Sequence, residues 1–175
     1  MKHQSIILTL ILLSLLCISC GSKVAVEKNP IGDEVWSSVK TIEFSFNDAS
    51  LPPEYHRSYH VKVTETMAYL SVTSYSQSLL KKTYDIEPQQ FQKAIEALKR
   101  LDIRRDNVQS EPCSGGESES FSIYGGSPNA QELFSGWHDT CGSSTMNVPF
   151  GAIPNALNAA FPQSINSLVD TTREQ

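Results

Sequence analysis

Apolar and polar residues alternate along residues 40–75, and this alternation restricts the fold more than any other pattern in the chain. In the first stretch Ile42, Phe44 and Phe46 share one face. The next two stretches continue the pattern, with one face carrying Tyr55, Arg57, Tyr59, Val61 and Val63, then Ala68, Leu70 and Val72. A period of two residues indicates β-strands with one buried face. Because the connections are short, we expect neighbouring strands to be antiparallel.

The period changes after residue 87, following a further expected strand at 79–86. Apolar residues then recur at helical spacing, namely Phe91, Ile95, Leu98 and Leu101. Pro88 suits the first turn of a helix, and Glu87 places negative charge at its positive end. This pattern predicts the main helix at residues 88–101.

A hairpin and a second helix complete the expected domain. Phe121 and Ile123 face the core from one strand, and Leu133 faces it from a returning strand at 131–137. Ile153, Leu157 and Phe161 predict a short C-terminal helix. We therefore expect an α+β fold, in which an antiparallel sheet of about five to seven strands packs against these two helices.

Cys113 and Cys141 flank the predicted hairpin and are expected to form one disulfide. The hairpin brings both flanks to the same end of the sheet. The alternative is a catalytic thiolate, for which His138, three residues before Cys141, is the nearby base. The disulfide is the simpler assignment if the domain lies outside the cytoplasm, where thiols are commonly oxidised.

The N-terminus has the three parts of a secretory signal. Lys2 supplies a positive charge, residues 6–16 are almost entirely apolar, and small residues surround Cys20. The apolar run falls short of the about 20 residues that span a bilayer. The ending resembles the lipobox of bacterial lipoproteins, with Ser19 before Cys20 and with Cys17 where that family usually has leucine.

This resemblance implies lipidation of Cys20 and cleavage of a signal peptide at residues 1–19. We expect a flexible lipid-anchored tether at 20–34, a single domain at 35–169 and a disordered tail at 170–175. Gly21 follows the cysteine where aspartate favours inner-membrane retention in such lipoproteins, so we expect an outer-membrane anchor facing the periplasm in a bacterium with two membranes. An ordinary cleaved signal, an uncleaved anchor and a Cys17/Cys20 metal or redox pair are the alternatives.

Composition and motifs exclude several function classes. The net charge is −5, which disfavours nucleic acid as a partner. No nucleophile elbow and no phosphate-binding loop occur in the sequence. His56 and His60, on one strand, are roughly 13 Å apart, too far to bind one metal ion. We expect no catalytic residues, no metal site and no cofactor.

The richest local group of functional side chains is Trp137, His138 and Asp139, which we expect on a loop braced by the disulfide. Tryptophan is common at binding hot spots, so this loop is the candidate binding site. The alternative is that Trp137 covers the core while His138 and Asp139 face water. The resulting hypothesis is a non-enzymatic cell-envelope module that binds a protein. The rivals are an envelope hydrolase with His138 and Asp139 in its site, and a purely structural lipoprotein.

Overall fold

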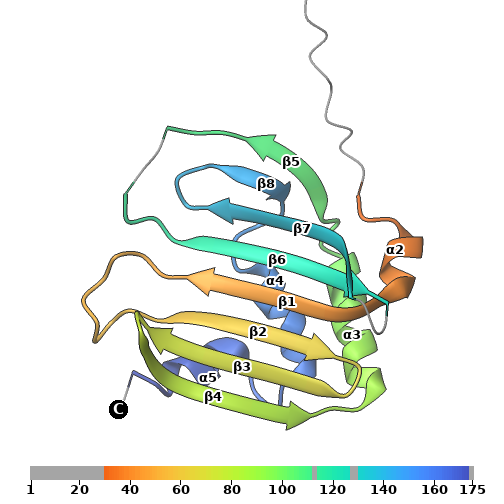
Figure 1. The fold of residues 1–175 in the computed structure, drawn as a ribbon, viewed down its shortest axis with the longest axis horizontal. Coiled ribbons are helices and arrows are strands. Elements are labelled where there is room, and N and C mark those ends of the chain that lie inside the picture. The colour runs from red at the N-terminus through yellow and green to blue at the C-terminus, as the bar shows by residue number, and fades with distance from the viewer. Residues whose placement is uncertain (1–29, 112–113, 127–129, 174–175) are drawn as a thin grey trace, which may run out of the picture.

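The computed structural model describes residues 30–111, 114–126 and 130–173. It confirms the α+β class: a single antiparallel sheet has helices packed on one face (Figure 1). The sheet has eight strands, more than the five to seven predicted. In chain order the elements are α2 (Asp33–Ser38), β1 (Val39–Asn47), β2 (Ser58–Thr64), β3 (Met67–Ser74), β4 (Gln77–Asp85), α3 (Pro88–Lys99), β5 (Arg104–Val108), β6 (Ser118–Gly125), β7 (Gln131–Asp139), β8 (Ser144–Asn147), α4 (Ala152–Leu157), the 3₁₀ helix η2 (Asn158–Ala160) and α5 (Ile165–Asp170).

The strand order across the sheet is β4-β3-β2-β1-β6-β7-β8-β5. Strands β1 to β4 form the predicted meander, and α3 then carries the chain to the far edge, where β5 lies. Strands β6, β7 and β8 fill the space between β1 and β5. The sequence prediction missed β5 because Val108 is its only apolar residue, and β8 because it has only four residues.

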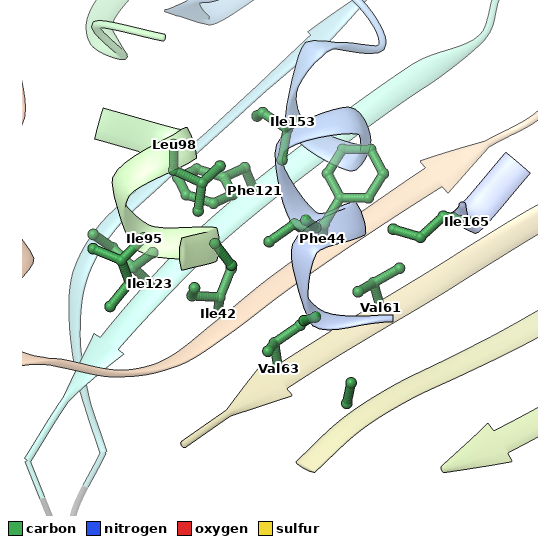
Figure 2. Close-up of a cluster of buried hydrophobic side chains, with 14 of the residues drawn as sticks. Ile42, Phe44, Val61, Val63, Ile95, Leu98, Phe121, Ile123, Ile153 and Ile165 are labelled. Carbon is green, nitrogen blue, oxygen red and sulfur yellow. The ribbon is translucent and has the colours of Figure 1, made fainter. Parts of the chain in front are cut away.

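Helices α3, α4 and α5 cover one face of the sheet, here called the inner face (Figure 1). The predicted face of the first strands is buried, and Figure 2 shows Ile42, Phe44, Val61 and Val63 packed against helix side chains. The main helix begins at Pro88 as predicted, with Glu87 and Gln90 forming a capping box. It ends at Lys99 instead of residue 101, just before Asp102 adopts a left-handed backbone conformation with φ 52°.

The C-terminal part contains more ordered structure than predicted. Helix α4 and η2 confirm the short helix around Ile153 and Leu157. A further helix, α5, begins after Ser164, whose hydroxyl accepts a hydrogen bond from the Ser167 amide. The expected disordered tail is wrong for residues 170–173, because Thr172 is buried.

The described N-terminal residues also belong to the domain. Pro30 pairs with Arg104, and the Ile31 amide donates to the Ile103 carbonyl at 3.1 Å. Trp36 of α2 is buried in the core. Residues 30–34 of the predicted tether are therefore part of the domain, because Ile31 packs against the core and α2 begins at Asp33. The predicted signal peptide and Cys20 lie outside the described residues.

Candidate functional site

The segment with Trp137, His138 and Asp139 lies at the end of strand β7, whereas a loop was expected. Alternation along the strand places Trp137 and His138 on opposite faces. Trp137 is 43% exposed on the face that no described helix covers, and His138 is only 7% exposed on the inner face. Both expectations for these two residues are therefore wrong: they do not share one patch, and Trp137 does not cover the core.

A β-bulge explains this reversal. The register between β6 and β7 shifts between Ile123 and Tyr124, so that Phe134 pairs with Ile123. Phe134 is consequently buried, while the predicted core residue Leu133 is only partly buried. A shift of one residue moves every later side chain of a strand to the other face. His138 thereby becomes an inner-face residue.

Asp139 has a local structural role. Its Oδ1 atom accepts hydrogen bonds from the backbone amides of Cys141 and Ser143, both at 2.9 Å. Aspartate commonly forms such turns with amides two or more residues ahead. The carboxylate therefore stabilises the turn from β7 to β8 and is not paired with His138.

The proposed partner of Cys141, Cys113, lies outside the described residues, so the disulfide remains a prediction. The chain on either side of the two positions is nevertheless joined by hydrogen bonds. The Ser110 and Ser143 hydroxyls are 3.0 Å apart, and the Thr140 amide donates to the Glu117 carbonyl at 3.0 Å. These contacts bring the flanks of both cysteines to the same end of the sheet, as the hairpin predicted.

The true partner of His138 is Glu119 on the neighbouring strand β6. His138 Nε2 lies 2.8 Å from Glu119 Oε2, and the carboxylate is almost completely buried at 1% exposed. Its other oxygen, Oε1, accepts a hydrogen bond from the Gly151 amide at 2.9 Å. A buried carboxylate requires such partners, since an unpaired one strongly destabilises the fold. Sequence analysis missed Glu119, although it alternates with Phe121 and therefore shares the core-facing side of the strand.

An open cleft of about 360 Å³ lies beside this pair, where the inner face meets α4 and α5. One wall is aromatic: Phe46 stacks on Tyr59 at 5.2 Å between centroids, and Phe150 meets Phe46 edge-on at 6.2 Å. Phe150 also stacks on the imidazole of His138 at 5.1 Å. Burial, and secondarily the Glu119 carboxylate, raise the pKa of Tyr59, so its hydroxyl remains a hydrogen-bond donor at neutral pH.

Arg57 closes one end of the cleft and holds the C-terminal segment in place. Its guanidinium is buried and donates to the hydroxyl and carbonyl of Thr172, at 2.8 and 2.9 Å. A third bond goes to the carbonyl of His56 at 2.7 Å. The two Thr172 acceptors lie just beyond the C-terminal end of α5, where a cation is favourable. Arg57 is thus a structural residue of the cleft wall.

The opposite face of the sheet, here called the outer face, is uncovered by any described helix (Figure 1). Alternation places small hydroxyl side chains and a few rings on it, including Ser45, His60, Tyr69, Ser122, Trp137 and Thr145. His60 Nδ1 lies 3.0 Å from the Ser45 hydroxyl, and partial burial lowers its pKa from the ordinary value of 6.5. The outer face also carries the ion pair of Lys62 and Glu43, whose charged atoms lie 2.9 Å apart, and a shallow hollow of about 160 Å³ beside Ser45 and His60.

Within the described ranges, no group of histidine, cysteine, aspartate or glutamate residues is arranged to hold a metal ion. None of the helices in the described part of the chain is both long and apolar enough to cross a membrane. In comparisons with known proteins, no family model, no curated protein and no solved structure matches this chain.

Proposed function

We propose that this protein is a non-enzymatic binding module, held at the cell envelope by lipid on Cys20, whose outer face contacts a partner protein. The observation that carries this proposal is the uncovered outer face with the exposed indole of Trp137. Tryptophan and tyrosine are the residue types that contribute most often to protein-binding hot spots. Tyr69 lies on the same face in β3, four strands from β7, which carries Trp137, so the rings are spread across the face.

The size and shape of the outer face suit a protein better than a small ligand. Eight strands spaced by about 4.8 Å, with an average length of about 24 Å, give a surface of roughly 900 Å². A stable protein interface buries about 800 Å² on each partner. Small ligands bind in concave pockets of about 300 Å³ or more, and the hollow beside His60 is smaller, at about 160 Å³.

The point where the described chain begins leaves the outer face uncovered. The chain enters the domain beside α2, at the upper right of Figure 1, and pairs with the edge strand β5 through Pro30. This entry point lies at one end of the sheet and leaves the outer face open. A lipid-anchored domain of this form presents the outer face to other envelope proteins.

The hydrolase alternative has less support. Asp139 is engaged in a turn, and His138 is buried against Glu119. Among the described residues, no serine, threonine or cysteine side chain donates a hydrogen bond to His138, as an activated nucleophile would. The proposed disulfide between Cys113 and Cys141 would brace the β6–β7 hairpin and leave no free thiolate.

Site-specific photocrosslinking in bacterial cells tests this proposal. A photoreactive amino acid replaces Trp137 in the full lipidated chain, and a matched variant carries it at Lys93, which is exposed on the other side of the molecule on α3. We expect a discrete crosslinked protein from position 137 that is absent from position 93. Identical products from both positions, or none from position 137, would reject the outer face as the binding surface.

The anchor is tested separately by labelling with palmitate. We expect the wild-type chain to incorporate the label and Cys20→Ala to lose it. Label retained in the mutant would show that another residue carries the lipid, or that the lipoprotein assignment is wrong. The crosslinking experiment alone tests the outer face as a binding surface, so the two results are independent.

A further inference from the structure

We propose that the cleft beside Glu119 is a second binding site, on the inner-face side of the molecule, and that it takes a neutral carbohydrate. The cleft is separated from the outer face by the sheet itself, since Glu119 and Tyr59 point to the side that the helices cover. This site is therefore independent of the protein-binding surface proposed above.

The first observation is an aromatic ring with an open side. Phe150 lines the cleft, is 39% exposed and rests on the imidazole of His138. The His138 ring stacks on one face of the phenyl ring and Phe46 meets it edge-on at 6.2 Å, and the part of the ring that stays exposed lines the cleft. The face of an aromatic ring carries partial negative charge, which attracts the weakly positive C–H groups on one side of a sugar ring.

The second observation is a set of polar side chains whose hydrogen bonds are not used within the protein. Tyr59, Asn155 and Asn166 line the same cleft. Their side-chain polar atoms make no hydrogen bond to any other residue in the described part of the chain. A phenol and two amides offer both donors and acceptors, as a ligand rich in hydroxyl groups requires.

The third observation is that the charged groups of the cleft already have partners. Glu119 is bonded through both oxygens, to His138 and to the Gly151 amide. Arg57 donates to the carbonyl and hydroxyl of Thr172, and Arg173 pairs with Asp170 at 3.2 Å. The two arginines and two carboxylates also balance in formal charge. The cleft thus has no surplus positive charge to attract a phosphate or another strong anion. Binding of a neutral ligand does not depend on such a charge.

The volume limits the size of the occupant. About 360 Å³ is near the lower end of the range for ligand pockets, which runs from about 300 to 1,000 Å³. Because the cleft is open, a short stretch of a longer glycan fits as well as a free oligosaccharide. Hexoses and N-acetylhexosamines share the chemistry described here, so the experiment must compare them.

The test is an NMR titration of the full lipidated chain in a detergent that has no sugar headgroup. The probes are chitotriose, maltotriose and inorganic phosphate. We expect one of the two sugars to cause saturable shifts of the Gly151 backbone amide and of the Asn155 and Asn166 side-chain amides, and phosphate to cause none. The sugar that binds identifies an N-acetylhexosamine or a plain hexose as the preferred unit.

Two variants locate the binding, and two controls lie outside the cleft. Phe150→Ala should weaken the sugar affinity by about tenfold, through loss of the stacking surface. Tyr59→Phe keeps the ring and removes only the hydroxyl, and should weaken it about fivefold. Tyr55→Ala and Trp137→Ala remove exposed rings elsewhere and should leave the affinity unchanged.

Three results would overturn the carbohydrate site. These are the absence of shifts with both sugars, equal shifts with phosphate, and a sugar affinity that neither Phe150→Ala nor Tyr59→Phe reduces. Because Tyr59→Phe is a minimal change, the last result is decisive even if Phe150→Ala alters the fold. None of these results bears on crosslinking at position 137, so this proposal and the proposed protein-binding function fail separately.

Discussion

The two faces of strand β6 differ in burial and in whether their polar side chains have hydrogen-bond partners. On the inner face Glu119, Phe121 and Ile123 are buried, and the one charged residue among them has a partner at each oxygen. On the outer face Ser120 and Ser122 remain partly exposed and need no partner. The difference teaches that the helix-covered side determines stability, whereas the uncovered side is free to serve recognition.

Truncation of an inner-face ring should have the largest effect. Phe121→Ala removes a fully buried phenyl ring that packs against Phe134 at 6.1 Å, and should lower the free energy of unfolding by about 3–5 kcal/mol. Chemical denaturation measures this change. The adjacent outer-face variant Ser120→Ala is the control and should stay within about 0.5 kcal/mol of wild type. Equal losses from both variants would break the comparison between the faces.

Loss of the proposed disulfide should have the next largest effect, although it touches neither face. Cys141→Ser should lower the free energy of unfolding by about 2–4 kcal/mol, because the unfolded chain is no longer cross-linked. Thiol titration of the denatured, unreduced protein should find neither Cys113 nor Cys141 free. If both thiols titrate, the loop contacts of Ser110 and Glu117 alone hold this end of the hairpin.

Removal of the buried carboxylate tests whether the inner face tolerates charge only because it is paired. Glu119→Ala leaves His138 and the Gly151 amide without their acceptor, and should cost about 1–3 kcal/mol. Glu117→Ala is the matched control, since the Glu117 side chain makes no hydrogen bond with another described residue. A stable Glu119→Ala protein, with an unfolding midpoint equal to that of Glu117→Ala, would contradict a structural role for the pair.

The smallest effect is a pH dependence on the outer face. Partial burial and the nearby Lys62 lower the pKa of His60, while Glu43 opposes them. The unfolded chain therefore binds a proton at His60 more readily than the folded protein does. Stability linked to this residue is complete above pH 6.5 and falls as the pH drops from there toward the folded-state pKa.

Titration of the His60 ring by NMR, together with unfolding curves at several pH values, measures this dependence. His60→Gln should flatten the stability profile below pH 6.5 relative to wild type. An ordinary or raised pKa for His60 would show that the outer face is as well hydrated as open solvent.

Local patterns predicted much of this fold correctly. The alternation around Ile42 and Phe44 placed the first strands and their buried sides, and helical spacing placed α3 from Pro88 onward. These predictions succeed because strand and helix periods are properties of consecutive residues. The missed elements lack such a period: β5 has a single apolar residue, Val108, and α5 follows a proline that suggested the end of the helix.

The candidate site was less accessible to prediction. Trp137, His138 and Asp139 were found from their residue types, but the prediction that they form one patch was wrong. The bulge opposite Ile123 changes which of these side chains point inward. A bulge depends on the pairing of two strands and leaves no mark on either strand alone. The cleft combines residues from β1, β2, β6 and the C-terminal helices, which only folding brings together.

The sequence alone predicts a small antiparallel α+β domain, and a lipoprotein-like leader that would direct it to the cell envelope. The period of the apolar residues is sufficient to predict the α+β domain, because it indicates which side of each strand or helix is buried. Tertiary structure decided that His138 is paired with Glu119, that Trp137 is exposed, and that a cleft forms beside α5. The physical reason is that strand register, unlike strand period, is determined by contacts between residues that are far apart in the chain.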